Sequence, residues 1–418
     1  MSHRLSDIRH LVFITVSGGA DGGGGIPGGI RAELERRATE CVAYHLVSPD
    51  EDRAALWAGY GAELTAAGHS VTLGQDAAQL CTAFGSGALP ELTTVETDAA
   101  GLRAALEALE SAPELAASAL VAVEVRAGES LPVVDAQGSL GAPGTLWLFS
   151  PWSPGGWVSE EVLDHTSLLQ LCERWTADRG EEVRAILPAW RRAVCGELLS
   201  AIELRGADEV GPLPEIDGRR FVRPVPYFPV VDLRVDDGAV LLLSNIGPMA
   251  TRSVNLRIDD GVSVTHHTVP GVMREDAVPL EVPVAVRDGR YDVTVLGPNH
   301  FRRRFAGSLP STVRCRAEHF ATGDPRFPTL TLAVSHELKL PVFFRLEHRL
   351  GERASDPRFA SGVFERYPGP RQTLTFHESP ATTTYGWYEF AVTTPADEGW
   401  IQEYAGQLPS GAQVSISY

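Results

Sequence analysis

The sequence predicts an α/β domain, with a mostly parallel sheet sandwiched by helices, followed by two all-β sandwich domains. Over residues 1–204, short apolar runs alternate with amphipathic segments, an order typical of a parallel sheet covered on both faces. Beyond residue 222, short segments of period two are separated by turn residues, which indicates antiparallel sandwiches. Part of this second region occurs twice, and the repeat predicts two related sandwiches in tandem.

The strands of the first domain are expected at short apolar runs rich in β-branched residues. These runs occupy residues 8–16, 41–47, 69–75, 92–95, 118–125 and 145–149. Amphipathic helices are expected at residues 31–40, 52–68 and 98–112, with Asp98 as the N-cap of the last. A further helix is expected to begin at Leu163-Asp164, where a capping pattern follows a Pro-Gly-Gly turn.

A cluster of glycines between residues 18 and 29 separates the first expected strand from the first expected helix. A strand, a glycine-rich loop and a helix in this order can cradle a phosphate group. The cluster contains neither a GxxxxGK[ST] motif nor a GxGxxG motif with a well-placed acidic partner. We therefore interpret it as a flexible loop.

A linker is expected between the α/β domain and the sandwiches, because residues 205–222 are polar and contain Pro and Gly. The first sandwich is then expected at residues 223–308 and the second at residues 309–418. Their expected strands have the alternating pattern of half-buried sheets. Clear examples are residues 230–235, 239–245, 252–258, 291–297, 329–335, 342–348, 372–378 and 388–394.

The internal repeat consists of residues 290–307 and the similar residues 386–406. The first copy ends in Phe305-Ala306-Gly307 and the second in Tyr404-Ala405-Gly406. Each copy is expected to close one sandwich. In the first copy, alternate side chains of Arg302-Arg303-Arg304 are expected to face solvent.

The composition is that of an ordinary globular protein, with 44% hydrophobic and 22% charged residues. The formal net charge of −18 argues against a nucleic acid partner and against an anionic membrane surface, since both require a basic face. No run approaches the ~20 apolar residues of a transmembrane segment, and no secretory signal precedes the first strand. Five dispersed cysteines are typical of free thiols in a reducing compartment. We therefore expect a cytoplasmic protein.

Residues 150–202 carry several uncommon motifs in order. Ser-Pro-Trp-Ser at 150–153 leads into Gly-Gly-Trp-Val at 155–158, and Leu-Asp-His-Thr-Ser at 163–167 precedes Trp-Arg-Arg-Ala-Val-Cys-Gly at 190–196. This stretch resembles the C-terminal part of the catalytic domain in bacterial phosphocholine-specific phospholipases C and related acid phosphatases. The resemblance implies an alkaline-phosphatase-like α/β fold and, like the strand pattern, two C-terminal β domains.

The resemblance continues weakly toward the N-terminus, where the family's catalytic residues are replaced. Ser17 and Gly18 stand where the family has a glutamate and an asparagine of its catalytic centre. Arg126 stands where the family has an aspartate, residues 89–98 lack the family's histidine, and the chain after His45 is shorter than the family's nucleophile region. Together these departures imply that the hydrolytic site is lost, and we expect neither a metal nor a cofactor.

Other residues could form a different site. The candidate catalytic residues are Asp164 and His165, at a loop-to-helix junction on the carboxyl side of the expected sheet, and His45, which follows a strand. The alternative is that Asp164 only caps a helix and that both histidines are structural. Trp152 and Trp157 could hold a cationic group by cation–π contact, or could be packing anchors. The candidate ligand-binding residues are thus Ser17, Gly18, Arg126, Trp152 and Trp157.

The sequence predicts a phospholipase C-like protein that has lost metal-dependent phosphoester hydrolysis. It would act as a binding or scaffold protein or serve another small-molecule step, with the small molecule or protein partner unidentified. One alternative is an active hydrolase of phosphate ester bonds with a rearranged site, which a tightly bound divalent metal would favour. Another is a transferase or cyclase of secondary metabolism, which a deep apolar pocket near Trp152 and His165 would favour.

Overall fold

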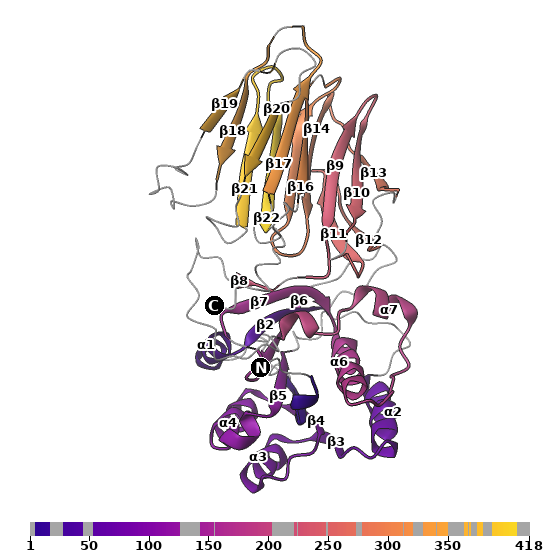
Figure 1. The fold of residues 1–418 in the computed structure, drawn as a ribbon, viewed down its shortest axis with the longest axis vertical. Coiled ribbons are helices and arrows are strands. Elements are labelled where there is room, and N and C mark those ends of the chain that lie inside the picture. The colour runs from indigo at the N-terminus through magenta and orange to yellow at the C-terminus, as the bar shows by residue number, and fades with distance from the viewer. Residues whose placement is uncertain are drawn as a thin grey trace. The chain divides into compact units, whose positions relative to one another are not determined.

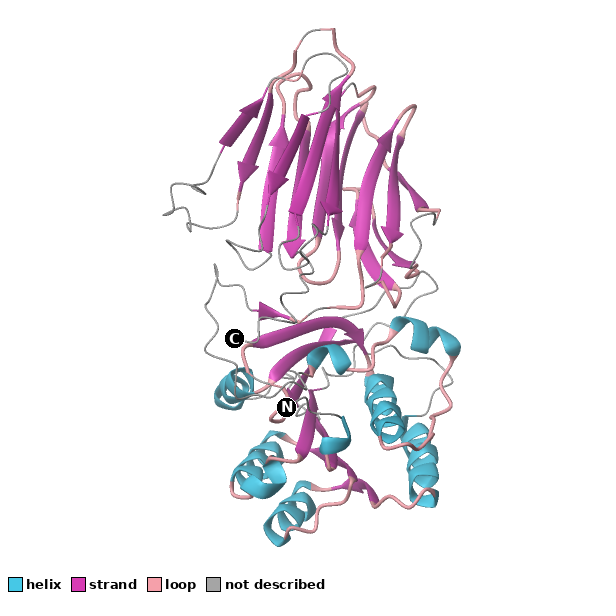
Figure 2. Cartoon of the chain, viewed as in Figure 1, coloured by secondary structure: helices cyan, strands magenta, loops and turns pink. Residues whose placement is uncertain are grey.

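The chain divides into one compact unit with residues 1–213 and 220–225 and a second unit with residues 226–417 (Figure 1). The computed structural model describes residues 5–16, 28–44, 53–125, 143–153, 155–202, 221–223, 225–247, 250–272, 278–311, 313–320, 329–339, 341–349, 363–366, 368, 374–378 and 387–407. Within these ranges, the helices all belong to the first unit, whereas the second unit is built of strands and loops (Figure 2). The predicted change from α/β to all-β structure is confirmed.

The first unit is built on an eight-stranded sheet in the order β3-β4-β1-β5-β6-β2-β7-β8. All neighbouring pairs of described strands are parallel except the two that β6 makes with β5 and β2. The predicted mostly parallel sheet is therefore confirmed. Its strands are β1 (His10–Val16), β2 (Thr39–Tyr44), β3 (Val71–Gln75), β4 (Leu92–Thr97), β5 (Ala119–Val125), β6 (Pro143–Phe149), β7 (Trp157–Leu163) and β8 (Phe221–Val222).

Helices cover both faces of this sheet. Successive side chains of a strand point to opposite faces, so Leu11 and Phe13 of β1 join one buried cluster, with α2 and α6, while Val12 and Ile14 join another, with α1, α3 and α4. The α-helices are α1 (Gly28–Arg37), α2 (Arg53–Ala66), α3 (Ala77–Ser86), α4 (Ala99–Glu110), α5 (Pro113–Ala116), α6 (His165–Asp178) and α7 (Ala189–Val194). Two short 3₁₀ turns are η1 (Leu5–Asp7) and η2 (Leu199–Ala201).

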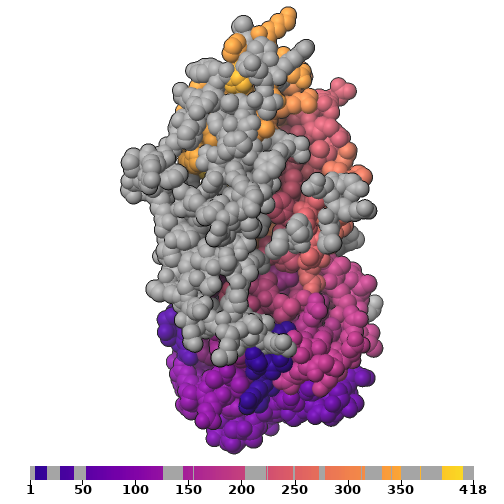
Figure 3. Space-filling model, in the orientation of Figure 1, coloured from indigo at the N-terminus to yellow at the C-terminus, as the bar shows by residue number. Residues whose placement is uncertain are grey.

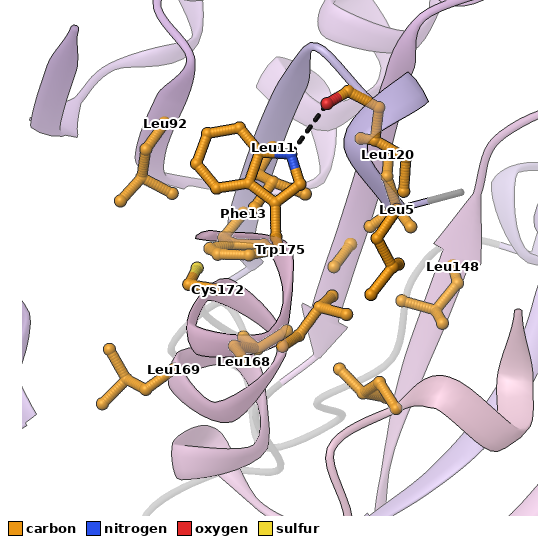
Figure 4. Packing of buried hydrophobic residues seen from close by; sticks show 14 of the residues in the cluster. Leu5, Leu11, Phe13, Leu92, Leu120, Leu148, Leu168, Leu169, Cys172 and Trp175 are labelled. Carbon is orange, nitrogen blue, oxygen red and sulfur yellow. Dashed lines mark hydrogen bonds between the residues drawn. The ribbon is translucent and has the colours of Figure 1, made fainter. Parts of the chain in front are cut away.

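Helix α6 shows how one face of the sheet is closed. Its apolar side chains point toward those of β1 and β5 (Figure 4), and Trp175 is fully buried among them. The indole N–H of Trp175 donates to the carbonyl oxygen of Ile8 at 2.7 Å. A large ring with a satisfied N–H stabilises a core without leaving a buried donor unpaired.

Three elements of the first unit illustrate how the structure differs from the sequence-based expectation. The strand expected from residue 41 begins at Thr39, because Thr39 and Glu40 already pair with β6, so α1 ends at Arg37 and not at residue 40. Helix α3 was missed, although Asp76 and Gln79 form a capping box at its start. Strand β7 was missed because its two glutamates interrupt the apolar run that predicts a buried strand.

The second unit consists of one eight-stranded and two three-stranded antiparallel sheets in the part of the chain that the structure describes. Strands β9–β13 are β9 (Pro229–Val235), β10 (Ala239–Asn245), β11 (Val254–Asp259), β12 (Val264–Val269) and β13 (Leu280–Val284). Strands β14–β18 are β14 (Arg290–Leu296), β15 (Arg302–Ser308), β16 (Val313–Phe320), β17 (Thr329–His336) and β18 (Phe344–His348). The last four are β19 (Val363–Arg366), β20 (Leu374–Glu378), β21 (Trp387–Thr393) and β22 (Ile401–Gln407).

The same strand order occurs twice in this unit. Strands β9–β15 form the sheets β13-β10-β9 and β12-β11-β14-β15, and strands β16–β22 form β20-β17-β16 and β19-β18-β21-β22. We call these sets the first sandwich and the second sandwich. Two β-sandwiches of one topology confirm the fold predicted from the repeat. The domain boundaries expected at residues 204, 222 and 308 stay predictions.

The two sandwiches share one sheet, because β15 pairs with β22. Arg302 lies opposite Ala405 and Ala306 lies opposite Ile401, with Arg304 opposite Glu403 at the centre. In the repeat, Arg302 corresponds to Ile401 and Ala306 to Ala405. The pairing therefore maps each copy onto the other, and a local two-fold axis passes through the Arg304–Glu403 pair.

Two glycines explain why the repeat was visible in the sequence. Gly307 lies opposite Tyr291, and Gly406 lies opposite Tyr388. A Cβ atom on Gly307 would lie 2.7 Å from the Tyr291 hydroxyl, and one on Gly406 would lie 2.9 Å from the Tyr388 hydroxyl. Only glycine leaves space for the tyrosine in each hairpin, so both copies keep it.

Candidate functional site

The carboxyl ends of β1 and β5 carry a buried polar group, at the edge where open α/β sheets bind ligands. Thr15 of β1 lies opposite Glu124 of β5, and both side chains are buried. They continue the rows of β1 and β5 that face α2. Arg53, the first residue of α2, donates from Nη1 to Glu124 Oε1 at 3.0 Å and from Nη2 to the second oxygen. Its Nη2 also lies 3.4 Å from the Thr15 hydroxyl.

The Arg53–Glu124 pair determines the charge at this end of the sheet. A guanidinium that donates to both oxygens of a carboxylate neutralises its charge and occupies its favoured lone-pair directions. The side chain of Glu124 is only 5% exposed, so separating the pair would leave a buried charge, which is costly. In this arrangement Glu124 is therefore held as the ion-pair partner of Arg53.

Within the described ranges, no group of three or more His, Cys, Asp and Glu side chains converges in a way that could hold a metal ion. Four of the predicted site residues, namely Ser17, Gly18, His45 and Arg126, lie outside those ranges. Their assignment to the site stays a prediction.

Asp164 is buried at the junction between β7 and α6. One carboxylate oxygen accepts from the Thr166 N–H at 2.8 Å and from the Thr166 hydroxyl at 2.6 Å, and the other accepts from Arg191. The side chains of Asp164 and Arg191 are both 0% exposed. Asp164 therefore has the contacts of a helix cap in a buried ion pair, which favours the structural alternative for this residue.

The other predicted residues of this region have contacts of their own. His165 is half-buried at the first position of α6. Trp152 is buried in the same apolar cluster as α6. Trp157 is buried, and the Arg223 guanidinium lies 4.4 Å from the centre of its ring, so one face of the ring already has a cationic partner. These contacts favour packing roles for both tryptophans.

A cavity of about 530 Å³ lies in the second unit. Its walls include Asp260, Arg287 and Arg290, together with an ion pair in which Arg304 donates to both oxygens of Asp292 at 2.9 and 2.8 Å. This cavity is polar and charge-balanced. It is not the apolar pocket near Trp152 and His165 that would favour a transferase or cyclase.

Sequence reasoning missed Arg53 and Glu124, although the strand itself contained a signal. Residues 119–125 are apolar except for Glu124, and an acidic residue inside a buried strand requires a partner. The partner could not be identified, since Arg53 is 71 positions away and the sheet order that brings the two together depends on the whole domain.

The family model of the bacterial phospholipase C C-terminal domain matches residues 221–308. Three curated proteins are also similar to the chain. A "Non-hemolytic phospholipase C" of Burkholderia pseudomallei is 27% identical over 325 residues, which are 69% of this chain and 44% of the relative. A protein of the same description from Pseudomonas aeruginosa is 25% identical, over 65% of this chain and 42% of the relative.

The third relative is a "Hemolytic phospholipase C" of Pseudomonas aeruginosa, 26% identical over 69% of this chain and 45% of the relative. The chain thus spans less than half the length of the curated relatives it matches. Among the described helices, none is both long and apolar enough to cross a membrane.

Proposed function

We propose that this chain, which is a relative of the bacterial phospholipases C, acts as a binding or scaffold protein that has lost metal-dependent phosphoester hydrolysis. The family predicted from residues 150–202 is confirmed by the matches above. The loss of activity is our inference, and one observation carries it. At the carboxyl ends of β1 and β5, the Glu124 carboxylate is neutralised by Arg53 and is not grouped with other metal-binding side chains in the described chain.

The sequence supports the same proposal at three further positions. Divalent cations in phosphoester chemistry are held by carboxylate, amide and imidazole groups. Ser17 and Gly18 provide neither a carboxylate nor an amide side chain where the family has both, and Arg126 provides a positive charge. At these aligned positions a cation would find fewer oxygen ligands than in the family.

The experiment is a turnover assay with nitrophenyl phosphocholine and a nitrophenyl phosphomonoester, each with Mg²⁺, Ca²⁺, Mn²⁺ or Zn²⁺. We expect no release of nitrophenol above the protein-free control, because the cation needed to stabilise the transition state has no adequate ligand set. Glu124→Gln is assayed in parallel and should be equally inactive. Metal-dependent turnover that is lost in Glu124→Gln or His165→Gln would contradict the proposal.

The second candidate is an active phosphate ester hydrolase with a rearranged site. It is favoured by the names of the relatives, all of which are phospholipases C. The two candidates predict different results in the turnover assay. A rearranged hydrolytic site would still require a cation or another charge to stabilise the developing phosphoryl charge, whereas a binding protein would show no turnover with or without metal. A cytoplasmic location remains part of the proposal, as the acidic composition and dispersed cysteines suggest.

A further inference from the structure

Strand β12 is an outermost strand of the eight-stranded sheet in the second unit. Its sequence lacks the charged residues and prolines that usually prevent an outermost strand from pairing with another chain. Within the described residues β12 pairs with β11 alone, in an antiparallel register from Val254–Val269 to Asp259–Val264. Its sequence Val-Thr-His-His-Thr-Val contains no Lys, Arg, Asp, Glu or Pro. Four of these six residues are β-branched, which favours strand pairing. An uncharged, extended edge of this kind is a template for another strand.

The other sheet ends of the described chain are all protected. In the second unit, β9 has Pro229, Asp232 and Arg234, β13 has Glu281 and Pro283, and β16, β19 and β20 each contain charged residues. In the first unit, β8 has only two residues, and the pairing of β3 is irregular near Gly74. Charges, proline, short strands and irregular pairing each prevent association between sheet edges. β12 is the exception.

Two exposed valines lie at the start of β12, next to the exposed Arg257–Asp259 ion pair of β11. Val264 at its start is 49% exposed, and Val262 in the preceding turn is 52% exposed. Residues in the colour range of β11 to β14 reach the surface of the second unit in the space-filling view (Figure 3). Exposed valines beside an unprotected edge would be covered when a second strand adds to the sheet.

We propose that β12 is a self-association surface, at which two copies of this chain pair β12 with β12 in antiparallel orientation. We choose a second copy as the partner because the two sandwiches of this chain already pair in the same way. The first and second sandwiches join edge to edge through β15 and β22, around a local two-fold axis at Arg304 and Glu403. The fold therefore already tolerates extension of this sheet by a second sandwich of the same topology. A β12–β12 contact would extend it at its other end, with the same symmetry.

Symmetry also fixes the centre of the contact. A two-fold axis between antiparallel strands of one sheet is perpendicular to the sheet, so it keeps each side chain on its own face. Residues directly opposite each other share a face, and the axis must therefore pass through a residue paired with its own copy. The registers closest to full overlap pair five of the six residues, and the central residue is then His266 or His267. The proposed register is the one centred on His266, in which Val264 faces Thr268 of the second copy.

The association is expected to be weak. A six-residue edge contact buries less than the ~1,200 Å² that stable interfaces exceed. It should therefore populate only at high protein concentration, in rapid exchange with the monomer. This expectation sets the range of the experiment.

The experiment is sedimentation equilibrium of the full chain from about 1 to 200 µM, a range that covers weak associations of small area. We expect the weight-average mass to rise from 45.0 kDa toward twice that value. The double variant V264K/T268K places lysines opposite lysines across the axis, and directly opposed like charges oppose strand pairing. It should remain at the monomer mass over the whole range.

The matched control is V278K/L280K, which adds the same charge at two exposed apolar residues, at and just before the β13 edge of the same sandwich. It should associate as the original chain does. Both variants must keep the circular dichroism spectrum and melting temperature of the original chain, and amide exchange of residues 264–269 in the original chain should slow with concentration. A chain that stays monomeric at the highest concentration, a V264K/T268K variant that still associates, or a control that fails to associate would overturn the proposal.

Discussion

At the scale of single residues, the charged side chains buried in the first unit determine what the domain can do. Glu124 and Asp164 are both buried carboxylates near strand ends, and each is paired with an arginine, Arg53 or Arg191. A carboxylate that faces an arginine is a structural ion pair, whereas carboxylates that face each other attract a cation. The identity of the facing residue therefore matters more for function than the presence of the acid.

The cysteines are consistent with a structural role for buried polar groups. All five are free. Burial raises the pKa of Cys315 to about 12 and raises that of Cys172 well above its ordinary value. A thiol in this state is not a nucleophile at neutral pH. Neither residue is therefore a candidate for covalent catalysis.

The buried pair at Asp164 gives a prediction for stability. Asp164→Ala removes a helix cap and leaves the Arg191 charge buried without its carboxylate, so it should lower the free energy of unfolding by about 3–5 kcal/mol. The matched control is Asp98→Ala, which removes the exposed N-cap of α4 and should cost only about 1 kcal/mol. Urea unfolding measures both.

A double variant, Asp164→Ala with Arg191→Met, separates the two contributions. It removes both buried charges and should recover part of the loss, because replacing a whole buried pair by apolar groups is often neutral. Equal costs for Asp164→Ala and Asp98→Ala would show that the Arg191 contact contributes nothing and would reopen a catalytic role for Asp164.

At the scale of elements, a charged cluster that the sequence did not predict fixes α6 to the amino-terminal ends of β3 and β4. His69, which precedes β3, lies with Nδ1 3.2 Å from Glu91 and with Nε2 in contact with Glu181. Arg179, just after α6, donates to Glu91 at 2.8 Å and lies 3.9 Å from the centre of the Trp175 ring. The cluster links the starts of β3 and β4 to the end of α6, on the opposite edge from Glu124.

This cluster makes the stability of the first unit depend on pH. Burial acts to raise the pKa of Glu91, but hydrogen bonds from the Ser70 N–H, Arg179 and His69 outweigh it and hold that pKa below its ordinary value. A depressed pKa in the folded state stabilises the protein above the unfolded pKa of about 4.3 and loses that contribution as the pH falls through the folded value. The first unit should therefore lose stability between about pH 5 and pH 3.

Glu91→Gln tests this contribution. The variant should be less stable than the original chain at pH 7, and its stability should fall less steeply as the solution is acidified, because one titrating group has been removed. The control is Glu107→Gln on the exposed surface of α4, which should leave the slope unchanged. Melting temperatures from pH 7 to pH 3 provide the measurement, and parallel curves for the original chain and Glu91→Gln would rule out the assigned role of Glu91.

Elements with a strong local pattern were predicted well from the sequence, and those fixed by distant contacts were not. Asp98 and the periodic residues after it predicted α4, and the structure finds Asp98 as its N-cap. Strand β7 escaped prediction since Glu161, which is 2% exposed, breaks the apolar run. Its charge is accommodated by a hydrogen bond from Ser200, 39 positions later, and such a contact has no local signature.

At the scale of the whole molecule, the repeat predicted two related sandwiches but not how they join. The copies at residues 290–307 and 386–406 were visible because each hairpin keeps a glycine opposite a tyrosine. Their direct pairing through β15 and β22 depends on residues about 100 positions apart, which no periodicity reveals. The middle residue of the Arg302-Arg303-Arg304 run is 2% exposed, and its guanidinium lies 4.2 Å from the centre of the Phe301 ring, so alternate arginines do face outward as predicted.

In the candidate site, too, contacts between residues distant in the sequence could not be predicted. The sequence predicted replacement of catalytic residues at Ser17, Gly18 and Arg126 by comparison with a family, position by position. It did not predict that Arg53 would pair with Glu124, because that contact requires α2 to begin beside the end of β5. The comparison with the family therefore predicts which ligands are replaced, and the structure adds a residue pair that neutralises a buried carboxylate at the end of β5.

The most direct test of this account is the divalent metal content of the chain as purified without chelators, measured by inductively coupled plasma mass spectrometry. A centre with Arg53 on Glu124 and few other oxygen ligands should hold far less than one metal ion per chain. Glu124→Gln should give the same low content. One equivalent of Zn²⁺, Ca²⁺, Mn²⁺ or Mg²⁺ in the original chain, lost in Glu124→Gln together with phosphodiester turnover, would contradict the central claim.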